Sequence, residues 1–223
     1  MKIINPKIEV EKYDGKKIMK NIERAMRVCY RSEGMATEDS YKRLLKMAVD
    51  SKHESVMKHE KISIRIQCSL NFYKDITRHR TGVAFSIEST RWINYSKDKF
   101  NSELKFLDPV YITNPENYNI WKNTMAKIEE SYMKMASNGA KPDELRTMLP
   151  HSIAAEVAMT CNIREWRHIL KLRTSNRVHP EIRQIFIPLL LKFKADMPEL
   201  FGDIEYDTEF PEEWYAEISD MED

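Results

Sequence analysis

Apolar and polar residues alternate strictly from Glu60 to Ser69, the pattern of a β-strand with one buried face. The apolar side of this segment comprises Ile62, Ile64, Ile66 and Cys68. A strand is also predicted from Lys2 to Tyr13, and Ser89 to Tyr95 is predicted to be extended after a loop over Thr81 to Glu88. The stretch from Ser152 to Cys161 is rich in small and β-branched residues and fits either a strand or a helix.

Helical spacing of apolar residues predicts several amphipathic helices. The first runs from about Lys16 to Tyr30, and its apolar face comprises Ile18, Ile22, Ala25, Met26 and Cys29. The second begins near Thr37 as N-cap, and its apolar face comprises Tyr41, Leu44, Leu45 and Val49. Further helices are predicted over 69–80 with Ser69 as cap, over 114–139 with Asn114 as cap and Gly139 as stop, over 141–150, 162–174 and 180–197.

This order of elements predicts an α+β fold with long helices around a modest antiparallel sheet. With 223 residues the chain is expected to form a single domain, residues 1–223, that ends in an acidic tail over about 201–223. Hydrophobic residues make up 42% and charged residues 32% of the chain, the balance of a folded globular protein. No signal peptide or membrane-spanning stretch is apparent, so we expect a cytoplasmic location and no membrane partner.

The three cysteines, Cys29, Cys68 and Cys161, are far apart in the sequence, so neither a disulfide framework nor a metal site is expected. We expect them to be reduced and buried. The formal net charge of +1 argues against general attraction to nucleic acid. Basic residues nevertheless gather in two clusters, around 74–91 and 164–183, and such local clusters suit a compact anionic ligand.

The first basic cluster joins Arg78-His79-Arg80 to the segment from Ser86 to Trp92. Guanidinium groups match phosphate geometry, and a following loop with serine hydroxyls and free amides can bind the same anion. A solvated helix end whose cations complement the helix dipole is the structural alternative. The attached loop favours the phosphate interpretation.

Two further segments carry candidate chemistry. His53 and His59 are six residues apart, which differs from the HExxH spacing of zinc enzymes, so zinc is rejected. The segment from Asn162 to Arg173 is strongly basic, and Arg177 would share a face with Arg173 if the helix continued. A solvated basic helix and an RNA-binding surface remain alternatives for this segment, although exposed aromatic residues that would support RNA binding are few.

Taken in order, these motifs resemble the flavin-dependent thymidylate synthases. The family's signature, RHR followed by ExSxRY, is similar to Arg78-His79-Arg80 followed by Glu88-Ser89-Thr90-Arg91-Trp92. The segment 53–59 resembles the family's GHESxxEH, and Cys29 to Ser32 resembles its CYxS. Residues 145–150 resemble ARxxLP, and residues 162–173 resemble NxRSLxxFLxLR.

The resemblance implies FAD as cofactor, dUMP as substrate, and NADPH and methylenetetrahydrofolate as co-substrates in the methylation of the uracil ring. It implies a homotetramer whose sites use several subunits. The positions that match dUMP-binding residues are Asp75, Arg78, Glu88, Ser89, Thr90, Arg91, Arg146 and Arg173. The positions that match FAD-binding residues are Ser55, Arg78, His79, Arg80, Glu88, Asn162, Arg164 and His168. Arg173 matches the arginine that assists ionisation of the uracil, and His53 matches a histidine beside the active site.

The chain departs from the family pattern at several positions. Eight residues instead of seven separate the RHR motif from Ser89. The substituted positions are Asp75 for glutamine, Lys58 for glutamate, His168 for asparagine, Arg177 for histidine and Trp92 for tyrosine. A binding site changes its choice of ligand when a buried polar residue is replaced by one with the opposite hydrogen-bonding or charge character. Methylation or hydroxymethylation of another pyrimidine nucleotide therefore stays an alternative. A non-catalytic nucleotide- or RNA-binding protein on the same scaffold is the alternative from a different class.

Overall fold

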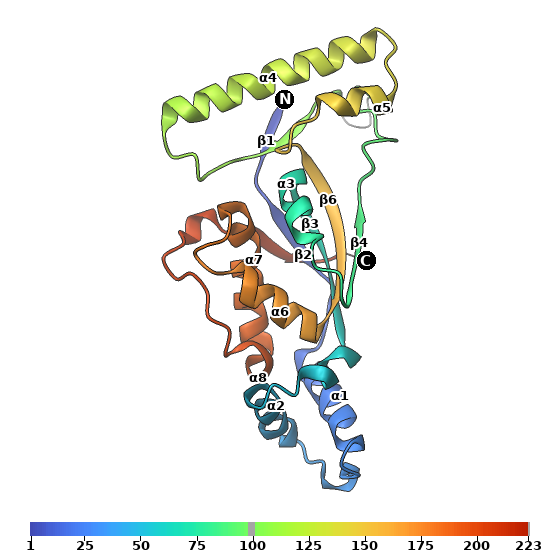
Figure 1. The fold of residues 1–223 in the computed structure, drawn as a ribbon, viewed down its shortest axis with the longest axis vertical. Coiled ribbons are helices and arrows are strands. Elements are labelled where there is room, and N and C mark those ends of the chain that lie inside the picture. The colour runs from blue at the N-terminus through green and yellow to red at the C-terminus, as the bar shows by residue number, and fades with distance from the viewer. Residues whose placement is uncertain (98–100, 223) are drawn as a thin grey trace. The chain divides into compact units, whose positions relative to one another are not determined.

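The computed structural model describes residues 1–97 and 101–222 of the chain (Figure 1). The strands are β1 Lys2–Ile4, β2 Lys7–Val10, β3 Lys61–Ser69, β4 Val83–Ile87, β5 Lys105–Leu107, β6 Ala154–Asn162 and β7 Glu217–Asp220. The α-helices are α1 Gly15–Val28, α2 Ser40–Asp50, α3 Leu70–Ile76, α4 Pro115–Ser137, α5 Pro142–Leu145, α6 Ile163–Arg173, α7 Pro180–Asp196 and α8 Pro198–Phe201. Short 3-10 helices are η1 Glu33–Met35, η2 Glu54–His59, η4 Arg146–Met148 and η5 Glu212–Trp214.

Two sheets organise the chain. One has five strands in the order β4-β6-β3-β2-β7, and the other pairs β1 with β5 in parallel. The α+β fold class is confirmed, although the parallel pair departs from the antiparallel pairing that the sequence predicted.

Contacts divide the chain into two compact units. Unit 1 comprises Met1–Lys7, Ile66–Arg78 and Ser86–Val157, and unit 2 comprises Ile8–Arg65, His79–Phe85 and Ala158–Asp223. The long strands β3 and β6 each supply residues to both units. The prediction of a single domain is not tested by this division and stays a prediction.

Unit 1 has its own hydrophobic core beneath the long helix α4. The buried members of this core are Tyr95, Leu104, Phe106, Met125, Tyr132, Leu145 and Ile153. Asn114 begins α4 by accepting hydrogen bonds from the amides of Glu116 and Asn117, and Pro115 occupies the first turn. The capping asparagine and the proline together explain why the start of this helix could be predicted correctly from the sequence.

Unit 2 is centred on Trp166, which is fully buried on α6. Its indole Nε1 donates to the carbonyl oxygen of Ile62 at 3.0 Å, so the polar edge of the ring is satisfied in the core. Phe193 of α7 meets this ring edge-on at a centroid distance of 5.7 Å. Helix α7 is buried over much of its length, as expected for a central element.

Most predicted elements are confirmed, including α1, α2, α4, α6, α7 and the alternating strand β3. Helix α2 begins at Ser40 with Asp39 at the N-cap position, so the prediction of Thr37 as its cap was wrong. The ambiguous stretch 152–161 forms strand β6. The predicted strand over Lys2 to Tyr13 is divided into β1 and β2 around Asn5 and Pro6, because proline lacks the amide that a continuous ladder requires.

Other predictions were wrong in identifiable ways. Helix α3 ends at Ile76, so the RHR motif follows the helix instead of closing it. Residues 83–87, predicted as loop, form β4, whereas 89–95, predicted as extended, form turns. Helix α6 ends at Arg173, so Arg177 lies beyond it and does not share its face.

Cys68 and Cys161 are buried as predicted, but Cys29 is exposed at the end of α1. The acidic tail folds within unit 2, where it begins at the last residue of α8 and contributes η5 and β7, and its last residue, Asp223, lies outside the described residues. Among the described residues, no helix combines the length and apolar composition needed to cross a bilayer.

Candidate active site

The segment after β4 in unit 1 carries four of the predicted nucleotide-binding residues. The Glu88 amide donates to the carbonyl oxygen of Glu156 at 3.2 Å, and the Glu156 amide donates to the Glu88 carboxylate at 3.3 Å. Burial raises the pKa of Glu88, and the hydrogen bond from Glu156 offsets part of this rise. The carboxylate of Glu88 is therefore held against strand β6.

Ser89, Thr90 and Arg91 form a turn directly after Glu88. The carbonyl oxygen of Ser89 accepts from the amides of Trp92 and Ile93 at 3.0 and 3.1 Å. Ser89 and Arg91 are exposed, whereas Thr90 is half-buried. This turn presents a hydroxyl and a guanidinium to solvent, which suits an anionic guest.

Arg91 links this turn to the segment that carries Arg146. Its Nε lies 3.4 Å from Oδ1 of Asp143 in α5, and both side chains are exposed. Arg146 begins η4 directly after α5 and is also exposed. An exposed pair of this kind is weak, so Arg91 can exchange Asp143 for a phosphate at little cost.

The remaining nucleotide-binding predictions in unit 1 lie around the end of α3. Asp75 is half-buried in the helix, and Arg78 is exposed just beyond the C-cap Thr77. Arg173, the last predicted member of the nucleotide set, belongs to unit 2.

In unit 2 the turn that follows the RHR motif meets the start of α6. The Asn162 amide donates to the carbonyl oxygen of Gly82 at 3.1 Å, and the Asn162 side chain caps α6 by accepting from the Glu165 amide. Gly82 has a φ of +72°, and a Cβ placed on it would lie 2.1 Å from the amide nitrogen of the Asn162 side chain. Only glycine fits here, a constraint that the sequence analysis did not identify.

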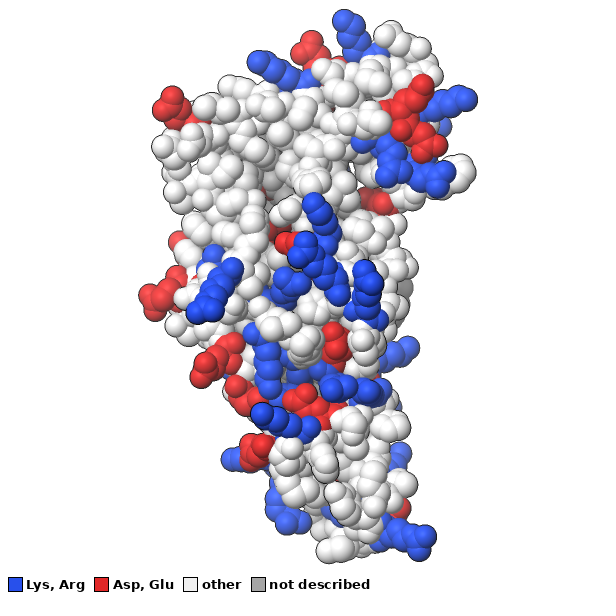
Figure 2. Space-filling model, viewed as in Figure 1, with Lys and Arg blue, Asp and Glu red and all other residues white. Residues whose placement is uncertain are grey.

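Arg80, Arg164 and His168 are exposed in unit 2, as are His53 and Ser55 beside η2. Within the described part of the chain, Arg78, Arg80, Arg146 and Arg164 form no ion pair with a carboxylate. Figure 2 shows basic side chains together with several acidic ones over the region of α6 on the face in view. Unpaired, exposed guanidinium groups match the donors that a dinucleotide pyrophosphate requires.

His79 is buried, with 8% of its surface exposed, among charged and polar groups of α6. Nε of Arg173 donates to Nε2 of His79 at 3.1 Å, and Oε1 of Glu165 lies 3.4 Å from Nδ1 on the other side of the ring. The ring of His168 meets that of His79 edge-on at 5.8 Å. Burial, the Arg173 charge and His168 lower the pKa of His79 to about 4, so the imidazole is neutral near pH 7.

His79, Glu165 and His168 also form a group whose ligand atoms lie within 4.8 Å of one another, a separation that a metal ion could bridge. Two features oppose a cation at this point. Arg173 occupies the Nε2 lone pair of His79, and its own positive charge lies beside the group. We therefore keep the prediction that no metal is required.

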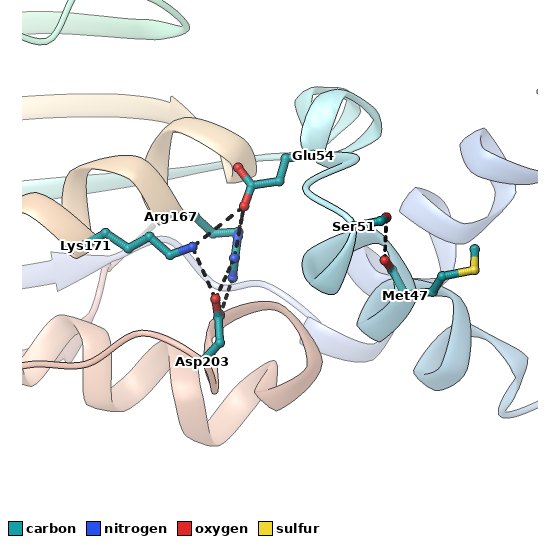
Figure 3. A network of polar contacts seen from close by, with 6 residues as sticks. All are labelled: Met47, Ser51, Glu54, Arg167, Lys171 and Asp203. Carbon is teal, nitrogen blue, oxygen red and sulfur yellow. Dashed lines mark hydrogen bonds and ion pairs between the residues drawn. The ribbon is translucent and has the colours of Figure 1, made fainter.

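Arg167 was assigned to the basic, anion-binding cluster, and for this residue the interpretation was wrong. Its guanidinium is fully buried and pairs with Glu54 at 3.0 Å and with Asp203 at 2.7 Å (Figure 3). Lys171 extends the network with a contact of 3.2 Å to Asp203. The network ties α6 to η2, which contains the predicted site residue Ser55 and directly follows the predicted site residue His53.

The charges of this network are balanced internally. Burial alone would raise the pKa of Asp203, but hydrogen bonds and positive charge from Arg167 and Lys171 outweigh it and lower that pKa. Arg167 therefore has a structural role, which sequence spacing could not reveal because its partners lie more than 30 residues away.

The chain is similar to known proteins over the range that holds these residues. The sequence profile of the family described as "Thymidylate synthase complementing protein" matches residues 11–199, which include every predicted site residue. A flavin-dependent thymidylate synthase from Pyrococcus abyssi is 29% identical over 150 residues, covering 66% of this chain and 60% of that protein. The chain belongs to the flavin-dependent thymidylate synthase family. A member from Corynebacterium efficiens is 24% identical over 208 residues, covering 84% of this chain and 80% of that protein.

The match to the Pyrococcus abyssi protein thus spans 60% of that protein's length. Two solved structures share the fold of this chain. The UMP/dUMP methylase PolB from Streptomyces cacaoi, bound with 5-Br dUMP, gives a TM-score of 0.73 at 18% identity and covers 91% of this chain and 96% of that chain. Thymidylate synthase X from Helicobacter pylori, with FAD and dUMP, gives 0.70 at 18% identity and covers 89% and 98%.

Proposed function

We propose that this chain is a flavin-dependent thymidylate synthase that methylates the 5-carbon of dUMP. The observation that carries the proposal is that the family match spans all predicted site residues, from His53 to Arg173. In this proposal FAD is the cofactor, NADPH the reductant and methylenetetrahydrofolate the one-carbon donor. A homotetramer with sites shared between subunits, and a cytoplasmic location, are part of the same proposal.

The donor set supports an FAD site in chemical terms. Arg80 and Arg164 offer unpaired guanidinium groups for a pyrophosphate, and the exposed Ser55 and His168 offer further donors. When bound, FAD supplies the redox chemistry that converts a transferred one-carbon unit into a methyl group. The chain's own residues bind and orient the ligands.

Arg173 is the residue that we propose to act on the uracil. Its guanidinium is half-buried, so it would stabilise negative charge on a uracil oxygen more strongly than an exposed cation would. Arg78, Arg91 and Arg146 would bind the phosphate of dUMP, and Glu88, Ser89 and Thr90 would bind the nucleotide through backbone and side-chain groups. No cysteine nucleophile is needed, and burial raises the pKa of Cys161 far above its ordinary range.

Purified protein tests the redox half of this proposal directly. We expect a yellow preparation with a flavin spectrum that NADPH bleaches without oxygen and that air restores. Protein that is colourless, and that added FAD does not colour, would overturn the proposal and favour a non-catalytic nucleotide-binding protein.

A second candidate substrate is UMP. PolB, which shares the fold of this chain with a TM-score of 0.73, is described as a UMP/dUMP methylase. Asp75 replaces the glutamine that many family members carry, and a changed polar partner alters ligand choice. Competition between UMP and dUMP for the purified enzyme separates the two substrates.

A further inference from the structure

The contacts of His79 determine which of its ring nitrogens carries the proton. An arginine Nε can only donate, and it lies 3.1 Å from Nε2, so Nε2 must offer its lone pair. A neutral imidazole then carries its single proton on Nδ1. That nitrogen is the one that faces the Glu165 carboxylate at 3.4 Å.

Glu165 is well placed to favour this tautomer. Burial raises its pKa, while the nearby His168 and Arg164 oppose the rise. Its position on α6 is fixed at the backbone, because its amide donates to the capping Asn162 at 2.9 Å. The carboxylate and the imidazole are therefore held in place by the same helix start.

Glu165 does not belong to the family's motif. The NxRSLxxFLxLR pattern has serine where this chain has Glu165, and the asparagine position of many members is His168. Two residues that contact His79 thus stand at positions where this chain departs from the family pattern. Their joint presence indicates a local arrangement that the family's known residues do not predict.

We propose that Glu165 is a positioning residue for Arg173, acting through His79. Glu165 favours the Nδ1–H tautomer of His79, Nε2 of His79 accepts from Nε of Arg173, and the guanidinium is thereby held in one orientation. A free arginine side chain has many rotamers, so holding it in advance lowers the entropic cost of engaging the substrate. The inference rests on the proposed function, in which Arg173 acts on the uracil.

The test compares Glu165→Ala with Glu165→Gln in the flavin-loaded full chain. The amide oxygen of glutamine can still accept from Nδ1–H, whereas alanine cannot. We expect Glu165→Ala to lower kcat for tritium release from dUMP by roughly ten- to a hundredfold, with KM changed much less, and Glu165→Gln to restore most of the activity. Glu213→Ala, at an exposed carboxylate of unit 2, is the control and should leave kcat unchanged.

A second readout does not depend on activity. Nitrogen-15 NMR of the imidazoles, with His79 assigned from its loss in His79→Gln, reports the tautomer directly. We expect Nδ1–H in the wild-type protein and in Glu165→Gln, and a mixture of tautomers in Glu165→Ala. An Nε2–H tautomer in the wild type, or an unchanged tautomer and kcat in Glu165→Ala, would overturn the inference.

The two readouts separate this inference from the proposed function. A wild-type protein that binds FAD but releases no tritium contradicts the proposed function. In that case the tautomer of the His79 imidazole still decides whether Glu165 positions it. If Glu165→Ala does not fold, Glu165→Leu, which fills the space but offers no acceptor, takes its place in both readouts. Addition of Zn²⁺ is the last arm: stoichiometric changes in the signals of both His79 and His168 would assign these residues to a metal site and overturn the positioning role.

Discussion

Arginine residues serve three different purposes in this chain. Arg167 is buried and neutralised by Glu54 and Asp203, Arg173 is half-buried and oriented by His79, and Arg78 is exposed without an ion pair in the described residues. The sequence shows the same residue type in all three cases. Their roles differ because tertiary contacts decide which guanidinium remains free to bind a ligand.

Replacing Arg173 tests its role at the uracil. We expect Arg173→Ala to keep the flavin and lose roughly a hundred- to a thousandfold in kcat, the usual cost of removing one group that stabilises developing negative charge. Steady-state kinetics and the flavin absorbance of the same preparation provide both readouts. Arg24→Ala, an exposed arginine of α1, is the control, and undiminished turnover in Arg173→Ala would contradict the assignment.

His79 makes the stability of unit 2 dependent on pH. Its pKa of about 4 in the folded chain lies below the ordinary value of 6.5, so the unfolded chain binds the proton more readily between these values. The contribution of neutral His79 is therefore complete above about pH 6.5 and is lost as the pH falls towards 4. Urea unfolding at pH 7 and pH 5 should show a smaller loss for His79→Gln than for the wild type, and equal losses would refute this assignment.

At the scale of elements, residue patterns located most helices and strands. Caps at Ser69 and Asn114 and the alternation in β3 are local signals, and the structure confirms them. Strand β4 was missed because its residues are only partly buried and their pairing with β6 is a long-range contact. The early end of α3 was missed because the charged residues that follow Thr77 are compatible with a helix.

The residues of the candidate site stay predictions, and their contacts could not be predicted from the sequence. Family motifs supplied the ligand-binding residues, whereas the contact of Gly82 with Asn162 and the approach of Glu165 to His79 depend on segments about 80 residues apart. The sequence alone does not show which of two segments so far apart in the chain lie close together in space. These contacts therefore became visible only in the structure.

Gly82 allows a prediction for the turn that follows the RHR motif. Gly82→Ala places a Cβ 2.1 Å from the Asn162 side chain and retains a positive φ, so we expect a loss of about 1–3 kcal/mol in the free energy of unfolding and weaker FAD binding. Gly139 is the matched control, because its φ is +87° but nothing lies within 4 Å of an added Cβ. Calorimetry with flavin titration measures both effects, and equal behaviour of the two variants would contradict a tight contact at Gly82.

The buried network around Arg167 gives a second prediction at this scale. Arg167→Met leaves the carboxylates of Glu54 and Asp203 with the partly exposed Lys171 as the cation that remains, so the free energy of unfolding should fall by about 2–4 kcal/mol. Arg65→Met, which breaks the exposed pair with Glu9, should cost less than about 1 kcal/mol. Chemical denaturation compares the two variants, and a similar small loss in both would show that the network contributes little.

At the scale of the whole molecule, the predicted residues divide by ligand. Those expected to bind the nucleotide lie in unit 1, apart from Arg173, and most of those expected to bind FAD lie in unit 2. The family match over residues 11–199 draws on both units, so neither unit alone holds the complete set of residues. The proposed function therefore belongs to the full chain.

Release of tritium from the 5-position of labelled dUMP is the most direct test of that function, because methylation must replace the hydrogen at this carbon. With the full chain, we predict release that requires FAD, NADPH and methylenetetrahydrofolate together and that exceeds the release from labelled UMP or dCMP. Absence of release from dUMP by protein that has bound FAD would contradict the account.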